Sequence, residues 1–278
     1  MKKLLLCGLL TLTAAAANAD VKYTTEMSMM QGGKLTPFST TTTWLKAGLQ
    51  RIDSQQNLGM YRQSESTITH CAKRQQIRFD SNLKITTSEA FAPGSTRPAN
   101  VPRGHAAPQN PGKSGTGKII MTPTIKFLGR EKIAGRDTRR YSITQRIQSS
   151  GCAGNSDTTI KMEIWMADVS LPNVSCSNTP GDWKQAYNTH GSRCKITFEQ
   201  RGDMKAYLAA YKGLPLKSIT YDASGKPMMQ MKITSISSAA LNASVFNAPG
   251  NFKKVSATEY DKTRQDAMIA AMTGGGAG

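Results

Sequence analysis

The fold of this chain is decided by the stretch GLPLKSITYDASGKPMMQMKITSI, residues 213–236. Apolar and β-branched residues dominate two runs, Leu216–Tyr221 and Met228–Ile236, which flank the turn-forming residues Ala223–Lys226. This pattern predicts two antiparallel strands joined by a tight turn. Other strand-like runs in the chain are also joined by short turns, so we expect a mainly antiparallel sheet.

Strand periodicity recurs on both sides of this hairpin. Between residues 159 and 166, apolar side chains occupy every second position, which is the period of a half-buried strand. The other predicted strands cover residues 21–29, 39–44, 49–53, 60–71, 76–80, 83–87, 118–121, 127–133 and 139–147. Helices are predicted over residues 204–211, over residues 182–189, and after a capping box formed by Ser256 and Glu259. One to three helices over one face of an antiparallel sheet make an α+β fold.

The amino-terminal segment, residues 1–19, has the three parts of a secretory signal. Lys2 and Lys3 precede an apolar run over residues 4–17, and the sequence ANA stands directly before Asp20. We therefore predict that residues 1–19 are removed and that the chain is exported to the periplasm or, alternatively, secreted into the medium. Export excludes ATP, nucleotide cofactors and nucleic acid from the expected partners.

The chain is strongly basic, with 36 Lys and Arg against 18 Asp and Glu and a formal net charge of +18. Outside the inner membrane, the anionic partners are lipid headgroups, lipopolysaccharide and cell-wall polymers. An anionic membrane or envelope surface is therefore an expected partner. The basic residues are scattered rather than grouped in blocks, which also fits a simple role in solubility.

The cysteine content predicts disulfides. Once Cys7 is lost with the signal, the cysteines that remain are Cys71, Cys152, Cys176 and Cys194. An even number in an exported chain predicts two bonds. Of the three possible pairings we favour Cys176–Cys194, which closes a local loop, together with Cys71–Cys152. A zinc site is disfavoured because no C-x₂-C pair is present.

Residues 92–117 differ in composition from the rest of the chain. They contain five prolines, five glycines and almost no bulky apolar side chains. Such a segment cannot bury enough surface to offset the entropy of ordering, so we predict a disordered insertion at the tip of a β-hairpin. The remaining sequence then forms a single domain over residues 20–255, followed by a helix and a flexible glycine tail over residues 256–278.

Several short motifs carry a family resemblance. They are Gly213-Leu214-Pro215 with the closing residues Phe246, Pro249 and Phe252, the hairpin Ile133-Ala134-Gly135, and Glu163-Ile164-Trp165-Met166 followed by Leu171-Pro172. In these motifs the sequence resembles the lipoprotein-carrier (LolA-like) superfamily. The resemblance implies an incomplete, strongly curved antiparallel β-barrel wrapped around the helices, with an apolar cavity between them. Members of the family bind acyl chains of lipoproteins or act as sensors in the envelope.

No catalytic motif accompanies this resemblance. The histidines His70, His105 and His190 have no acidic partner at a meaningful spacing, and we interpret them as surface residues. Residues 112–118 imitate a phosphate-binding loop, but Ile119 stands where the magnesium-binding hydroxyl is needed. We therefore expect a non-enzymatic protein without a cofactor or metal.

The resemblance and the many methionines on predicted strands lead to one functional hypothesis. Flexible thioether side chains suit an adaptable apolar cavity, although they also serve as ordinary core filling or, less commonly, bind copper. We expect an acyl chain or lipid-like molecule to bind between the sheet and the helices. The residues expected to line this cavity are Met27, Met29, Trp44, Ile164, Met166, Tyr207 and Tyr211. The alternative is a structural or sensory envelope protein with a filled core that contacts a partner.

Overall fold

The computed structural model describes residues 20–59, 61–91, 114–172, 176 and 194–274. The predicted signal peptide, residues 92–113 of the predicted insertion and the predicted helix over residues 182–189 lie outside the described residues. His105 and His190 lie outside them as well.

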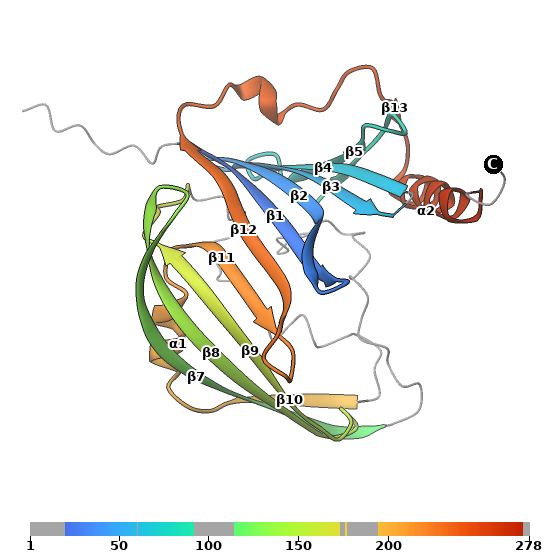
Figure 1. The fold of residues 1–278 in the computed structure, drawn as a ribbon. Coiled ribbons are helices and arrows are strands. Elements are labelled where there is room, and N and C mark those ends of the chain that lie inside the picture. Colours follow the sequence, from blue (N-terminus) through green and yellow to red (C-terminus); the bar gives the residue numbers. More distant parts are fainter. Residues whose placement is uncertain (1–19, 60, 92–113, 173–175, 177–193, 275–278) are drawn as a thin grey trace, which may run out of the picture.

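A single sheet of 13 strands forms the body of the described chain (Figure 1). From one edge to the other the strand order is β10-β7-β8-β9-β11-β12-β1-β2-β3-β4-β5-β6-β13. Neighbouring strands are antiparallel except at the two edges, where β10 pairs with β7 and β13 pairs with β6 in parallel. The strands are β1 (Val21–Gln31), β2 (Lys34–Lys46), β3 (Leu49–Leu58), β4 (Tyr61–His70), β5 (Gln75–Asp80), β6 (Ile85–Ala90), β7 (Gly115–Ile133), β8 (Arg136–Gly151), β9 (Ser156–Ala167), β10 (Cys194–Gln200), β11 (Leu214–Tyr221), β12 (Pro227–Ser238) and β13 (Lys253–Lys254).

The hairpin predicted over residues 213–236 is formed by β11 and β12. Asp222 holds its turn, because the side-chain Oδ1 accepts hydrogen bonds from the backbone N–H of Ser224 at 2.8 Å and of Lys226 at 2.9 Å. Gly225 adopts a φ of 82°, which a residue without a Cβ reaches at no steric cost. The turn chemistry therefore helps to fix the register of the two strands.

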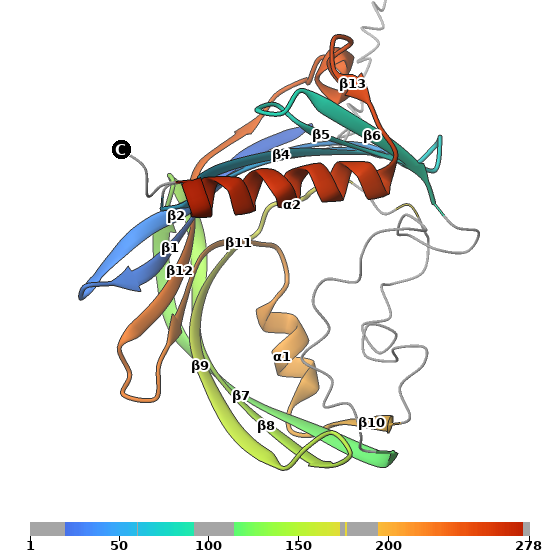
Figure 2. The same cartoon turned by 90° about the vertical axis from the view of Figure 1, so that its right-hand side faces the viewer.

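The sheet is strongly curved and is not closed into a barrel (Figure 2). Register shifts interrupt five of the strand pairings, for example between Phe127 and Gly129 in β7. Bulges of this kind bend a strand and increase its local twist. The predicted fold class, an α+β fold with a curved, mainly antiparallel and incomplete barrel, is confirmed.

The described helical elements are α1 (Met204–Ala210), the 3-10 turn η2 (Ala243–Phe246) and α2 (Ala257–Thr273). The predicted capping box opens α2, because the Ser256 hydroxyl accepts a hydrogen bond from the Glu259 N–H at 3.1 Å. In the part of the chain that the structure describes, neither helix has the length and apolar character that a bilayer crossing requires.

Strand register assigns every side chain to one of two faces, because residues paired across neighbouring strands point to the same side. We call the face that carries Met27, Ile164 and Arg78 the inner face. Both helices pack against it. Tyr207 of α1 packs beside Ile164, and Arg78 donates a 2.7 Å hydrogen bond to Asp261 of α2. Figure 2 shows α1 and α2 on this same side of the arc.

The opposite, outer face is covered at one end by the segment between β12 and β13. Phe246 of η2 packs there against Ile68 and Phe79, beside Trp44. His70 lies under this segment with its Nε2 atom 2.9 Å from the Phe246 carbonyl oxygen, and it is only 9% exposed. The prediction of a surface position for His70 is therefore wrong, because the segment folds back over the sheet.

Two predictions about the chain before β7 are also wrong. β7 begins at Gly115, so the last residues of the predicted insertion over 92–117 belong to a strand, and their backbone pairs with β10. β6 and β7 do not pair with each other and lie near opposite edges of the sheet. The intervening segment therefore connects two distant strands, rather than the two arms of a hairpin.

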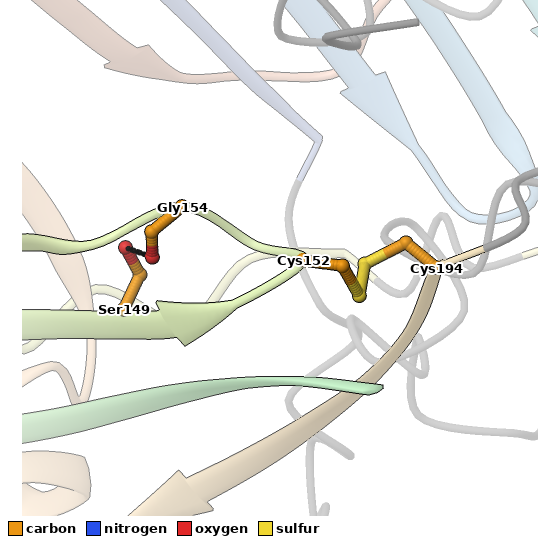
Figure 3. Close-up of a disulfide and its surroundings, with 4 residues drawn as sticks. All are labelled: Ser149, Cys152, Gly154 and Cys194. Carbon is orange, nitrogen blue, oxygen red and sulfur yellow. Dashed lines mark hydrogen bonds between the residues drawn. A yellow bond between two sulfur atoms is a disulfide. The ribbon is translucent and has the colours of Figure 1, made fainter. Parts of the chain in front are cut away.

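Both disulfides form, but not with the pairing that we favoured. Cys71 is bonded to Cys176, and Cys152 is bonded to Cys194 (Figure 3). Cys152 follows β8 and Cys194 opens β10, and both of these strands flank β7. The preference for Cys176–Cys194 relied on their closeness in sequence, whereas the sheet brings together residues that are distant in sequence.

Candidate binding surface on the inner face

Two rows of side chains run across the inner face from β7 to β1. The first row consists of Phe127, Tyr141, Ile164, Ser218, Met231 and Met27. The second row consists of Ile125, Ile143, Met162, Thr220, Met229 and Met29. Apart from the two hydroxyl residues on β11, all of these side chains are apolar or aromatic. We call the two rows together the inner apolar band.

The band is buried in its middle and open at both ends. Ile143 and Ile164 are fully buried, together with Met166 one position beyond the first row on β9. By contrast, Phe127 at the β7 end is 53% exposed and Met29 at the β1 end is 43% exposed. Soluble proteins seldom leave contiguous apolar surface uncovered without a binding role. The two open ends are therefore the parts of the band available to a ligand.

Helix α1 lies across the buried middle of the band. Its Tyr207 packs against the cluster around Ile143, and the Tyr211 hydroxyl donates a hydrogen bond to the Met162 Sδ at 3.3 Å. The rings of Tyr207 and Tyr211 are 4.9 Å apart. Leu208, on the side of α1 away from the sheet, is 67% exposed. The helix thus adds two aromatic rings to the band and leaves a further apolar side chain open to solvent.

The position of α1 is set by both of its ends. Asp203 caps the first turn, because its carboxylate accepts a 2.9 Å hydrogen bond from the Ala206 N–H. Beyond the helix, Gly213 has a φ of 107°, and a Cβ at this position would overlap the Ala167 carbonyl oxygen. Only glycine allows the chain to pass from α1 so closely against β9 and then enter β11.

At the α1 end, uncharged aromatic side chains lie next to exposed basic side chains. Burial raises the pKa of Tyr211 well above its usual value, and Tyr207 adds to the shift, so the phenol stays neutral. Exposed cationic side chains flank the aromatic residues: these are Arg130 on β7 and Lys205 and Lys212 on and after α1. An apolar surface with a basic border suits a molecule that has an oily chain and an anionic head.

Most of the residues predicted to line a cavity are brought together. Met27, Met29 and Ile164 belong to the inner apolar band and Met166 lies next to it, while Tyr207 of α1 and Tyr211 directly after the helix pack over it. Trp44 lies elsewhere. Its register with Arg51 and Ile68 places it on the outer face, in the cluster around Phe246.

Sequence reasoning missed other members of the band. Phe127, Ile143, Met229 and Met231 occupy strands whose alternation was visible, but alternation does not say which face points inward. Only the pairing of distant strands identifies them as neighbours.

The inner face under α2 is chemically different. Tyr260 is fully buried, with the guanidinium groups of Arg78 and Arg264 at 4.8 and 5.6 Å from its ring centroid. Arg264 forms ion pairs with Asp80 at 3.1 Å and with Glu65 at 3.0 Å. Burial, followed by the Glu65 carboxylate, raises the pKa of Tyr260 far above its usual value. Ionic and ring contacts therefore occupy this end of the face.

Comparison with known protein families and with characterised proteins finds no match. Solved structures do resemble the fold. An uncharacterized conserved protein from Thermus thermophilus is 9% identical, with a TM-score of 0.39 over 86% of this chain and 91% of that one. MucB in the Pseudomonas aeruginosa MucA/MucB complex is 14% identical, with a TM-score of 0.37 over 85% of this chain and 58% of that one.

The superfamily that the sequence motifs resemble is represented among these structures. A LolA superfamily protein from Nitrosomonas europaea is 9% identical, with a TM-score of 0.27 over 84% of this chain and 91% of that one. At this level, the similarity describes a general architecture and carries no argument about what this chain binds.

Proposed function

We propose that this protein is exported and binds the acyl chain of a lipid or lipid-like molecule on the inner apolar band, beside α1. The observation that carries the proposal is the apolar surface of β7, β8 and β9 and of β12 and β1, interrupted by Ser218 and Thr220 of β11 and open at Phe127 and Met29. The two disulfides support export, because such bonds persist in oxidising compartments.

The energetics favour a chain-like ligand with an anionic head. Each Å² of apolar surface that the ligand and the band remove from water contributes about 25 cal/mol. The basic side chains around α1 attract the headgroup and speed association, and salt weakens this attraction. The methionines adapt to different chain shapes, because their thioether side chains are flexible.

Binding is tested first on the purified mature protein. Native mass spectrometry and organic extraction should reveal a co-purified lipid, and a fluorescent fatty acid should bind with a blue-shifted emission. If neither lipid nor fluorescence response is found, the proposal is contradicted.

The location is tested with two matched charge substitutions. Met29→Asp places a carboxylate on the inner face, and Met30→Asp places one on the outer face of the same strand. Met29 is 43% exposed and Met30 is partly exposed. We expect Met29→Asp to weaken fatty-acid binding by about tenfold or more, because a charge opposes the burial of an acyl chain, while Met30→Asp leaves it nearly unchanged. Equal losses in both variants would place the ligand elsewhere.

A second candidate function is supported by the outer face. Arg140, Lys217 and Lys232 are neighbours there in one row with Trp165, and both Arg140 and Lys217 contact the Trp165 ring. Such a basic row suits an anionic membrane or envelope surface. Sedimentation with vesicles rich in anionic lipid tests it. Lys217→Glu with Lys232→Glu should abolish binding that wild type shows at low salt, and vesicles of neutral lipid should not bind.

A further inference from the structure

Four methionines meet at the β1 end of the inner face. Met27 is directly opposite Met231, and Met29 is directly opposite Met229, across the β1–β12 pair. Directly paired residues in an antiparallel sheet have Cβ atoms about 5 Å apart, and alternate residues along a strand are about 7 Å apart. Each methionine has three rotatable side-chain bonds, so the four sulfur atoms can converge on one point between the strands.

These four side chains are not part of the buried core. Within the described residues, none of them belongs to, or packs against, the three buried apolar clusters. Met29 is 43% exposed and the other three are partly exposed. Other methionines of the same face differ: Met166 is buried in the core, and the Met162 sulfur accepts a hydrogen bond from Tyr211.

A cluster of thioethers selects a particular class of ion. Thioether sulfur is a soft, neutral ligand and favours Cu(I) over hard cations such as Mg²⁺ or Ca²⁺. In the described part of the chain, no group of three or more His, Cys, Asp or Glu is placed to hold a metal. The four cysteines after the predicted signal all form disulfides, so thiolates do not compete for a soft ion.

We infer that Met27, Met29, Met229 and Met231 form a binding site for one Cu(I) ion. The thioethers keep their lone pairs at any physiological pH, because they have no proton to lose. They also remain available in an oxidising compartment, where free thiols are converted to disulfides. The site lies at the open end of the inner apolar band, but it does not depend on an acyl ligand.

The test uses Cu(I) supplied as its bathocuproine disulfonate complex, under anaerobic conditions with ascorbate and lipid-free mature protein. Wild type should withdraw one equivalent of Cu(I), seen as a loss of the chelator colour. Replacing all four methionines by leucine should weaken Cu(I) binding by more than about tenfold, because leucine keeps the apolar volume and lacks the sulfur ligand. Wild-type protein that withdraws no Cu(I), or a leucine variant that binds as wild type does, would overturn the inference.

A control separates this site from other methionines and from lipid binding. Met30 is the sequence neighbour of Met29 in a regular stretch of β1, so strand alternation places it on the other face. The variant Met30→Leu should bind Cu(I) as wild type does. Because Cu(I) withdrawal is measured on lipid-free protein and needs no acyl ligand, a failure of the copper site is distinguishable from a failure of the acyl surface. Loss of Cu(I) binding in the Met30→Leu control would contradict the assignment.

Discussion

The two helices close the same face of the sheet by different physical means. α2 docks through charged and hydrogen-bonding groups, with Tyr260 held between Arg78 and Arg264. α1 docks through aromatic and aliphatic contacts around Ile143, and directly after the helix the Tyr211 hydroxyl donates a hydrogen bond to the Met162 sulfur and the Arg139 guanidinium donates one to the Lys212 carbonyl oxygen. Charged networks are satisfied in one geometry only, whereas apolar contacts can be exchanged for contacts of similar shape. A ligand can therefore replace apolar contacts more readily at the α1 end of the face than at the α2 end.

The largest effect is expected from breaking the ionic attachment. Arg264→Ala leaves the buried carboxylate of Asp80, which is 1% exposed, without its ion-pair partner. Breaking a buried ion pair by removing one partner should lower the free energy of unfolding by about 3–5 kcal/mol. Urea unfolding measures the loss, and hydrogen exchange should show α2 amides opening while α1 keeps its protection.

The exposed pair on the same helix provides the control. Lys262 and Asp266 pair one turn apart at the surface of α2, with most of each side chain in water. Lys262→Ala should change the free energy of unfolding very little, because water screens an exposed ion pair. A similar loss in the Lys262 and Arg264 variants would show that burial of the network does not matter.

The next largest loss of stability is expected from removing the disulfide at the α1 end. Cys152→Ser with Cys194→Ser removes the link between the β8–β9 turn and β10, which precedes α1. A bridge across 42 residues should contribute about 2–4 kcal/mol. In the variant, amide hydrogen exchange should accelerate first in β10 and α1. The matched variant that lacks the Cys71–Cys176 bond should leave β10 protected, and early opening of β10 there would contradict this assignment.

A smaller change should loosen the apolar attachment. Ile143→Val removes one methylene from a fully buried position under α1 and should cost about 0.5–1.5 kcal/mol. We expect α1 amides to exchange faster and α2 amides to stay unchanged, which is the reverse of the Arg264 result. Equal changes in amide exchange in α1 and α2 would contradict the view that the two helices are attached by different interactions.

The smallest effect concerns pH and the segment that covers the outer face. Burial alone raises the pKa of Asp20, but hydrogen bonds from the Leu241 N–H at 2.8 Å and the Lys46 ammonium at 3.1 Å outweigh it, so the pKa is lowered. The stabilisation is therefore complete above about pH 4 and is lost as the pH falls through the folded-state pKa.

Asp20→Asn tests this pH dependence. The variant should be less stable than wild type by under about 1 kcal/mol at pH 7, and the difference should shrink in acid. Thermal unfolding measured from pH 7 to pH 2.5 gives the comparison. A difference that stays constant down to pH 2.5 would show that the Asp20 charge plays no part.

The sequence predicted local features well and distant pairings poorly. The β11–β12 hairpin and the Ser256 capping box were predicted because their signals lie within a few residues. β10 was missed, because its parallel pairing with β7 joins residues about 80 positions apart. Residues Gly115–Gly117 were predicted to be loop for the same reason. Glycine has no side chain and shows no strand periodicity, so only the pairing with β10 reveals that this segment is a strand.

The candidate surface shows the same limit. Alternation assigned Met27 and Ile164 each to one side of its own strand. The sequence does not reveal that pairing through β11 and β12 puts both side chains on the same face of the sheet. Trp44 illustrates the ambiguity, because the residues on either side of it, Thr43 and Leu45, are also buried. Both faces of that strand are covered, so hydrophobicity alone could not assign its inner side.

We propose that an acyl chain lies on the inner apolar band beside α1, and photo-crosslinking with a diazirine-bearing fatty acid, followed by peptide mapping, can locate it. We expect labelled residues along the inner apolar band and α1, from Phe127 and Tyr211 to Met29, with labelling suppressed by unmodified fatty acid. Labels confined to the outer-face cluster around Trp44 and Phe246, or no labelling that competes with fatty acid, would contradict it.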